Sequence, residues 1–355
     1  MSEEEMVNLK EAELHKLIKD KLMQAGMPDD QAEETANHLT YADMNGVHSH
    51  GAVRVEYYAE RIYKGGVNLK PKLSFEKTGP ATAIYHGDNA QGHYVANKAI
   101  PETIKLAKEA GSATVGISEV SHTGTLSYYV RQFAEADLFA FATTLSDPMV
   151  VPFGGAEVYY GTNPIAFAAP RANAEPIVFD MATTVQAWGK ILDARSKHRS
   201  IPDDWAVDGD GRPTTDPHKV EALLPIAGPK GYGLMMLADM LSGVLLGLPS
   251  GKNVSSMYHD LSEYRNLGQA FIVIDPERFA GLEHFKQATK QNVEELHQVK
   301  PAPGYEQVYY PGELSAMTHA RHEKEGVDIP KEIVDYLKSD DIHFDRYDHK
   351  GIFAE

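Results

Sequence analysis

The chain has 355 residues, no cysteine and a formal net charge of −17 at pH 7. Its 42% hydrophobic and 24% charged residues are typical of a globular protein, and no apolar run is long enough to span a bilayer. The acidic excess disfavours nucleic acid and anionic membranes as partners, and the missing cysteines exclude disulfides and thiolate chemistry. We therefore expect a cytoplasmic protein with no membrane or nucleic-acid partner.

Amphipathic helices are predicted throughout the first 78 residues. Apolar residues between Leu14 and Leu22 share one helical face, and a second helix is expected to end near Gly46. A third helix is predicted from Ser49, acting as N-cap, to Gly65. Residues 1–78 are therefore expected to form a helical N-terminal part.

Strands and helices alternate from residue 79, which indicates an α/β domain over residues 79–280. The expected strands are Ala81–Tyr85, Ala113–Ile117, Phe139–Leu145, Ile165–Ala169, Ile177–Phe179 and Ala270–Asp275. The expected helices are Tyr94–Ala110 with a break at Pro101, Leu126–Ala136, Val185–Arg195 and Gly231–Leu246, and Ser196–Pro225 reads as a surface excursion. Polar helices near Leu282–His297 and Pro330–Ser339 make up a C-terminal part, residues 281–355.

His50, Arg54 and Tyr58 are spaced four apart and would share one face of the third helix. Together they suit a small carboxylate, because Arg54 can grip both oxygens in a fork while Tyr58 adds a hydrogen bond. The positive end of the helix dipole would favour a neutral imidazole at His50. A solvated polar face with half-buried tyrosines is the alternative, and this segment alone favours it.

Polar side chains follow several of the predicted strands, which is a usual position for catalytic groups in α/β sheets. A neutral His122 in such a loop can take a proton from a substrate hydroxyl, and Asp147 can orient that imidazole or bind a polar group of the substrate. The alternatives are a histidine that caps the next helix and an aspartate that serves the turn before Pro148.

Two glycine-rich segments are candidates for binding a cofactor. Lys230 lies in the turn Gly228–Gly233 at the start of an apolar helix, where backbone amides favour an anion, although a tight turn needs no ligand. Thr162 and Asn163 can bond a cofactor amide or serve turn chemistry. No G-x-G-x-x-G follows a strand, so a dinucleotide would be bound without the usual Rossmann fingerprint. No third ligand accompanies His48 and His50, so no metal is expected.

Five motifs occur together in a resemblance that covers about residues 8–312 of the chain. They are Asp43–Arg54, the Ser121-His122 loop, Gly161–Pro164, Phe179–Ala182 and Gly228–Gly233. In this combination the chain resembles the malate/L-lactate dehydrogenase-like oxidoreductases, which use nicotinamide cofactors on a fold that is not Rossmann. The resemblance implies oxidation of a small 2-hydroxy acid with NAD, NADP not being excluded. It also implies a homodimer, and a mixed-sheet α/β cofactor domain flanked by a helical domain formed from both chain ends.

The resemblance also assigns roles to single residues. His122 is implied to be the general base with Asp147 nearby, and His50 is its rival. Ser49, His50, Arg54 and Tyr58 are implied to line the substrate site, and Ser146, Asp180, Met181, Ala182 and Lys230 are implied to contact the cofactor. Two alternatives stay open here: an enzyme for another 2-hydroxy or 2-oxo acid, and a protein that binds an anion without turning it over.

Overall fold

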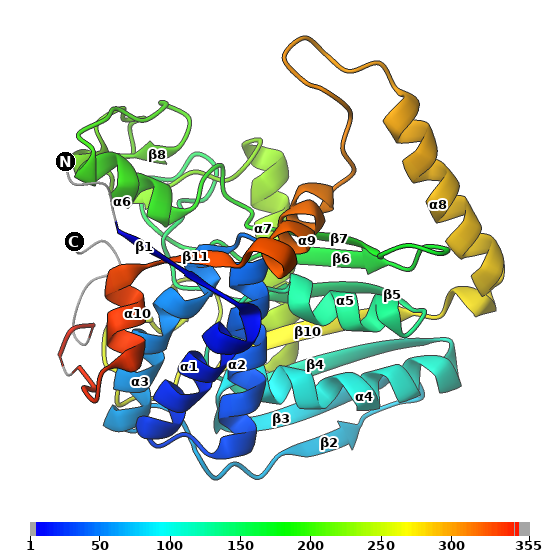
Figure 1. Ribbon diagram of the computed structural model, residues 1–355, viewed down its shortest axis with the longest axis horizontal. Coiled ribbons are helices and arrows are strands. Elements are labelled where there is room, and N and C mark those ends of the chain that lie inside the picture. The colour runs from blue at the N-terminus through cyan, green and yellow to red at the C-terminus, as the bar shows by residue number, and fades with distance from the viewer. Residues whose placement is uncertain (1–4, 344, 348–355) are drawn as a thin grey trace.

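A mixed seven-stranded sheet runs through the middle of the computed structural model, which describes residues 5–343 and 345–347 (Figure 1). The strand order is β2-β3-β4-β10-β5-β6-β7. Their bounds are β2 Ser74–Lys77, β3 Thr82–Ala90, β4 Ser112–Val120, β5 Phe139–Thr144, β6 Ile165–Ala169, β7 Ile177–Met181 and β10 Leu267–Ile274. The six strands predicted from the sequence are all present, and this order is not that of a Rossmann sheet.

The directions of the strands decide where the loops meet. Strands β4 and β5 both pair antiparallel with β10, so they run parallel to each other. Strand β7 is antiparallel to β6, which is antiparallel to β5, so β7 shares their direction. The carboxyl ends of all three strands therefore lie at one edge of the sheet, where the segments that hold His122, Asp147 and Asp180 come together.

Helices cover both faces of this sheet. Helices α4 (Gly92–Ala110) and α5 (Ser127–Glu135) pack on one face, and α7 (Pro229–Ser242) packs on the other. The main hydrophobic core lies between the sheet and α4 and α5. Helix α4 continues through Pro101 without the predicted break, because its neighbouring residues Ala99, Ile100 and Thr103 are buried and tertiary packing stabilises the helix.

The two chain ends share a second core, as the fold prediction required. The elements concerned are α1 (Glu11–Gln24), α2 (Asp29–Met44), α3 (Val55–Lys64) and α10 (Lys331–Lys338). Strand β1 (Met6–Leu9) pairs antiparallel with β11 (Val327–Pro330), which joins the ends directly. The ammonium of the buried Lys21 donates to the carbonyl oxygens of Ser339 and Asp341, at 2.8 and 2.7 Å.

Other parts of the chain depart from the expectations. Helix α8 (Leu282–Gln298) lies far from α1–α3, on the opposite side of the molecule (Figure 1), and Val293 is its one buried residue. Helix α9 (Glu313–Glu325) was not predicted, and it packs against α2. The excursion after α6 (Trp188–Ser196) contains a small sheet of β8 (Ala206–Val207) and β9 (Ala222–Leu223) with its own apolar cluster. In the described part of the chain, no helix has both the length and the apolar character to cross a membrane.

Candidate active site

Two imidazoles stack at the edge of the sheet where β4 ends. The rings of His50 and His122 lie 5.8 Å apart between centroids, with 25° between their planes. Burial lowers the pKa of His50 to about 3, and burial together with the nearby His50 and Arg54 lowers the pKa of His122 well below its usual 6.5. Both rings are therefore neutral near pH 7, and either can accept a proton.

The helix expected to carry His50, Arg54 and Tyr58 begins later than predicted, at Val55. His50 and Arg54 lie in two short 3-10 turns, His48–His50 and Ala52–Arg54, and Ser49 is not an N-cap. The prediction of one helical stripe is therefore wrong. Burial and the charge of Arg54, and not the dipole of that helix, keep His50 neutral.

Asp43 explains why the chain turns here instead of forming a helix. Its buried carboxylate accepts hydrogen bonds from the backbone N–H of Ala52, at 2.7 Å, and from Nδ1 of His48, at 2.9 Å. A side chain that satisfies backbone donors in this way competes with helical hydrogen bonds. The turn still brings His50, Arg54 and Tyr58 together, so the predicted convergence is present with a different cause.

Tyr58 connects helix α3 to the loop of His122. Its phenol oxygen lies 2.7 Å from Nδ1 of His122, and its side chain is 1% exposed. Burial raises the pKa of Tyr58, so the phenol stays neutral. When His122 carries its proton on Nδ1 and donates it to Tyr58, the lone pair of Nε2 remains for a substrate proton.

Arg54 holds the turn and still offers a charged donor. Its Nε donates to the carbonyl oxygen of Ser49 at 2.7 Å, and its Nη1 donates to the phenol of Tyr258 at 2.9 Å. The hydroxyl of Ser49 is 2.9 Å from Nδ1 of His50. Among the described residues nothing bonds Nη2 of Arg54, so this nitrogen can bind a carboxylate, although Nε is not available for the expected fork.

Asp147 was expected to orient the imidazole of His122, but it pairs with Arg265 instead. One carboxylate oxygen accepts from Nη2 of Arg265 at 2.5 Å, and the other accepts from the backbone N–H of Met257. Arg265 is 2% exposed and Asp147 is 4% exposed, so this is a buried ion pair. The group that orients His122 is Tyr58, and Asp147 orients Arg265.

Sequence reasoning missed Arg265 and Tyr258, which both come from the segment before β10. No helical or strand periodicity marks this segment, and its one signal is an arginine between Tyr264 and Asn266. The pairing of Arg265 with Asp147 spans 118 residues, so only the folded chain reveals it.

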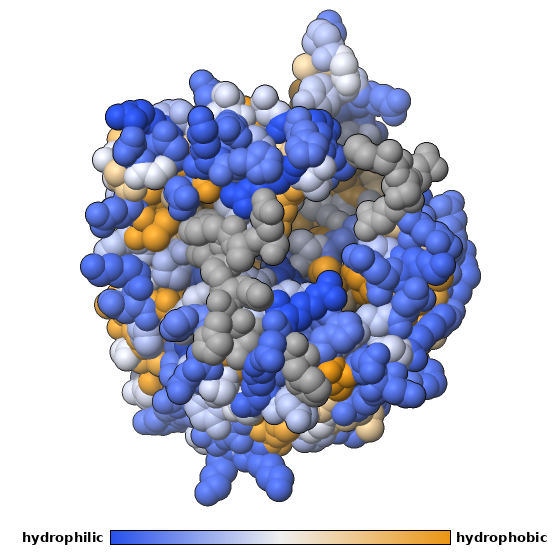
Figure 2. All heavy atoms as spheres, turned by 90° about the vertical axis from the view of Figure 1, so that its left-hand side faces the viewer, coloured by the Kyte–Doolittle hydropathy of each residue, from blue (hydrophilic) through white to orange (hydrophobic). Residues whose placement is uncertain are grey.

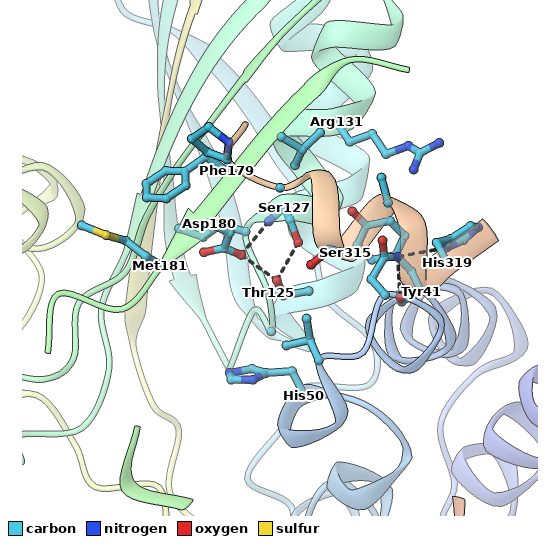
Figure 3. Close-up of a pocket in the computed structure, with 18 of the residues that line it drawn as sticks. Tyr41, His50, Thr125, Ser127, Arg131, Phe179, Asp180, Met181, Ser315 and His319 are labelled. Atoms are coloured by element: carbon cyan, nitrogen blue, oxygen red, sulfur yellow. Dashed lines mark hydrogen bonds between the residues drawn. The ribbon is translucent and has the colours of Figure 1, made fainter. Parts of the chain in front are cut away.

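A cavity of about 670 Å³ begins at Ser49 and His50 and extends between β7 and α9 (Figure 3). Of the predicted cofactor contacts, Asp180, Met181, Ala182 and Thr162 line this cavity. Asp180 accepts hydrogen bonds from the hydroxyl of Thr125, at 2.6 Å, and from the backbone N–H of Ser127, at 2.8 Å. Burial raises the pKa of Asp180, while these two bonds oppose the rise.

Ser146 and Asn163 stand behind the wall of the cavity. The hydroxyl of Ser146 lies 2.9 Å from that of Thr162, which faces the cavity. The amide of Asn163 is buried and bonds the backbone of Ser146 and of Met235, both at 3.3 Å. Asn163 therefore fixes the Ser146 loop against α7, and its amide is not presented to the cavity.

Lys230 does not reach this cavity in the described structure. It is exposed on the first turn of α7 and is absent from the lining. The buried position of that turn belongs to Gly231, where a Cβ atom would lie 1.9 Å from the carbonyl oxygen of Ile226. The close contact at Gly231 turns its neighbour Lys230 outward, and it requires this glycine without any ligand. A cofactor contact of Lys230 stays a prediction.

The surface on the α6 and α10 side of the molecule is mainly hydrophilic. Figure 2 shows a hollow near the middle of this face, with hydrophobic side chains along parts of its edge. Within the ranges that the structure describes, no three His, Asp or Glu side chains gather as a set of metal ligands.

Comparison with known proteins identifies the family. The family model for malate/L-lactate dehydrogenase matches residues 9–338. The ureidoglycolate dehydrogenase (NAD(+)) of Escherichia coli O157:H7 is 56% identical over 96% of this chain and 98% of its own length. The L-sulfolactate dehydrogenase of Methanocaldococcus jannaschii is 38% identical over 91% of this chain and 93% of its own.

Solved structures give the same result. The sulfolactate dehydrogenase from Methanocaldococcus jannaschii has a TM-score of 0.87 at 37% identity, covering 94% of this chain and 96% of that one. The malate dehydrogenase from Pyrococcus horikoshii OT3 has a TM-score of 0.84 at 33% identity, covering 94% of both chains. Because the family model matches nearly the whole chain and the fold is shared with these enzymes, the chain belongs to the malate/L-lactate dehydrogenase family.

Proposed function

We propose that this protein oxidises (S)-ureidoglycolate to oxalurate with NAD⁺, a step of allantoin catabolism. The observation that carries the proposal is the cluster of His50, His122, Tyr58 and Arg54, in which His50 lines one end of the 670 Å³ cavity and stacks on His122. The 56% identity to a ureidoglycolate dehydrogenase (NAD(+)) supports this substrate and this cofactor.

The cavity has the size and the chemistry to hold a nicotinamide dinucleotide. Its volume lies in the range of roughly 300–1,000 Å³ that is usual for ligand pockets. Asp180 and Thr162 offer acceptors for hydroxyl and amide groups, and Val178 and Phe179 offer apolar surface for a ring. Bound NAD⁺ supplies the acceptor for the hydride that leaves the hydroxyl-bearing carbon.

The substrate carboxylate would bind next to this cavity. Nη2 of Arg54 supplies a charged donor, and the buried Arg265 adds a second guanidinium, whose charge Asp147 balances. Ser49 and Tyr258 hold Arg54 in place through its other nitrogens. Arg265 and Tyr258 would therefore act beside the predicted substrate residues Ser49, His50, Arg54 and Tyr58.

His122 would take the hydroxyl proton of the substrate as the hydride leaves. The proton goes to Nε2, and the hydrogen bond from Nδ1–H to the phenol oxygen of Tyr58 stabilises the positive charge that forms on the ring. Because burial lowers the pKa of His122, the free base is fully present at neutral pH, although protonation of the ring is less favourable. His50, stacked 5.8 Å away, stays the rival base.

A related 2-hydroxy acid is the alternative substrate. The family includes the L-sulfolactate dehydrogenase at 38% identity and the malate dehydrogenase structure at 33% identity. All these acids combine a carboxylate with a hydroxyl on the neighbouring carbon, so Arg54 and His122 suit each of them equally. The residues that contact the rest of the substrate, beyond its carboxylate and hydroxyl, therefore determine which acid is preferred.

One assay separates these possibilities. The purified protein is mixed with NAD⁺ or NADP⁺ and with ureidoglycolate, malate, lactate or sulfolactate, and absorbance of the reduced nicotinamide is followed. We expect the highest kcat/KM with ureidoglycolate and NAD⁺. A higher kcat/KM with another acid would transfer the function to that acid. Binding without any absorbance change across the whole panel would contradict a dehydrogenase.

We also propose that the protein is a homodimer. An exposed apolar face on α7 and the turn after it supports this, since such patches mark interaction sites. Its members are Leu234, Leu237, Met240, Val244 and Leu245. Light scattering after size-exclusion chromatography should give about twice the 39.1 kDa mass of the chain. A mass of one chain at micromolar concentration would contradict the proposal.

A further inference from the structure

His38 lies in α2, directly behind the loop of His122. Its side chain is completely buried, and its Nε2 accepts a hydrogen bond from the backbone N–H of Thr125 at 2.9 Å. An imidazole that accepts at Nε2 is neutral and carries its proton on Nδ1. Burial, together with the neighbouring His93 and His50, lowers the pKa of His38 well below 6.5, so this tautomer persists at neutral pH.

The backbone of the 121–125 loop lies very close to the imidazole of His38. At Gly124 the backbone is left-handed, with φ of +72°, and a Cβ atom would lie 2.2 Å from Nε2 of His38 and 2.6 Å from Nε2 of His93. The loop therefore approaches both imidazoles closely because position 124 has no side chain. The phenol of Tyr129 donates to the carbonyl oxygen of Thr123 at 2.5 Å and fixes the neighbouring peptide.

The same loop reaches the wall of the cavity. The hydroxyl of Thr125, whose N–H is held by His38, donates to Asp180 at 2.6 Å. Five residues along α2 from His38, Asp43 holds the turn of His50 through Ala52 and His48. Helix α2 thus anchors both segments that carry the stacked imidazoles, His122 through His38 and His50 through Asp43.

We propose that His38 is a positioning residue, whose Nε2 acceptor holds the 121–125 loop so that His122 meets both Tyr58 and the substrate hydroxyl. This rests on the proposed function, because it concerns the base of that reaction. His38 does not touch the cavity, so it acts through the loop. Displacement of a catalytic group by about 1 Å can cost roughly 100-fold in rate, so a single loop hydrogen bond can matter this much.

The proposal also predicts a change in the titration of His122. The groups that face this ring are His50 and Arg54 from the turn, Tyr58 from α3, His93 from α4, and Arg265 from the segment before β10. Burial is the largest cause of its lowered pKa. A loosened loop admits water to His122, so its pKa should rise toward the ordinary value of about 6.5.

Two variants with an amide side chain test whether the hydrogen-bond acceptor at position 38 matters, because both keep a polar side chain there. In His38→Gln the side-chain oxygen can take the position of Nε2, whereas in His38→Asn the oxygen is too close to the backbone to reach Thr125. Circular dichroism and thermal melting establish that each variant is folded. We expect His38→Asn to lose about 10- to 100-fold in kcat, with its acid limb moved to higher pH. His38→Gln should recover most of kcat and keep the limb in place.

A measurement without turnover separates this inference from the proposed reaction. The pKa of His122 is followed by NMR of its ring protons in wild type and in both variants, with no substrate or cofactor. A raised pKa in His38→Asn alone supports the positioning role even if no acid in the panel is oxidised. Equal His122 pKa values in all three proteins, or equal loss of kcat in both variants, would overturn it. If His38→Asn does not fold, the test rests on His38→Gln alone. An altered His122 pKa or kcat in His38→Gln would then overturn the proposal. An unchanged His122 pKa together with an unchanged kcat would support it.

Discussion

The phenol oxygen of Tyr58 lies 2.7 Å from Nδ1 of His122, where helix α3 meets the loop that follows strand β4. Tyr58 is buried and stays neutral, so its phenol oxygen can accept a hydrogen bond from Nδ1–H of His122 throughout the neutral range. A base whose other nitrogen is held by a buried group keeps one tautomer and one orientation.

Tyr58→Phe should therefore lower kcat while cofactor binding is retained. Loss of a hydrogen bond to a ring that becomes charged costs about 1.5–3 kcal/mol, which corresponds to roughly 10- to 150-fold in rate. Steady-state kinetics with the best substrate and NAD⁺ provide the measurement. Tyr57→Phe is the matched control, because the phenol of Tyr57 bonds Arg61 and not His122. Equal kcat for Tyr58→Phe and wild type would remove Tyr58 from the proton path.

The two candidate bases can be separated by their pH profiles. A histidine base is active only when neutral, and because the pKa of His122 is lowered, activity should persist through pH 6.5 and fall only at lower pH. His122→Asn should lower kcat by roughly 10²–10⁴ and remove that acid limb. His50→Asn should mainly raise the substrate KM and keep the limb. The reverse pattern would make His50 the base.

Arg54→Lys tests the carboxylate site. One ammonium cannot bond the carbonyl of Ser49, the phenol of Tyr258 and a substrate together, as the guanidinium can. We expect a loss in substrate binding of about 1.5–3 kcal/mol, seen as a higher KM, with the KM for NAD⁺ almost unchanged. An unchanged substrate KM would exclude Arg54 from the carboxylate site.

The sheet and the position of the site at its edge could be predicted because they depend on local patterns. Short apolar runs with β-branched or aromatic residues mark the strands, and polar residues directly after them mark the edge where His122 and Asp180 lie. The turn of His50 was mistaken for helix because its spacing fits one, and the competing carboxylate of Asp43 acts through tertiary position. Spacing alone cannot reveal that competition.

The polar groups behind the site could not be predicted for a related reason. Arg265 and Asp147 pair over a long sequence distance, and the bond from Thr125 to His38 spans 87 residues. In both pairs, the local sequence around one residue gives no indication of which residue it will bind. The glycine-rich turn of Lys230 has a second explanation that its sequence does not show, since the carbonyl oxygen of Ile226 leaves no room for a side chain at Gly231.

The ion pair of Asp147 and Arg265 should be important for stability. Both side chains are buried, so Asp147→Asn leaves the guanidinium of Arg265 without its counter-charge and should lower the free energy of unfolding by about 3–5 kcal/mol. Urea denaturation gives the value. The exposed pair of Lys16 and Asp20 is the control, and Asp20→Asn should cost less than about 1 kcal/mol. Equal, small effects in both variants would show that the buried pair does not stabilise the fold.

Buried neutral histidines should make the fold sensitive to mild acid. Burial lowers the pKa of His93 to about 3 and that of His38 well below 6.5, whereas an unfolded chain binds these protons near the ordinary value. The unfolded state therefore takes up protons first as pH falls. The stability contributed by the two rings is fully present above about pH 6.5 and is lost as pH falls toward the folded-state values.

Each of the two rings should lower the free energy of unfolding by up to about 1.4 kcal/mol per pH unit in that window. Urea denaturation at pH 7, 6 and 5 measures the slope while most carboxylates are still ionised. His93→Gln keeps a polar side chain next to Gln91 but cannot titrate, so it should reduce the slope by about one proton. An identical slope for wild type and His93→Gln would mean that His93 is protonated in the folded protein as readily as in the unfolded chain.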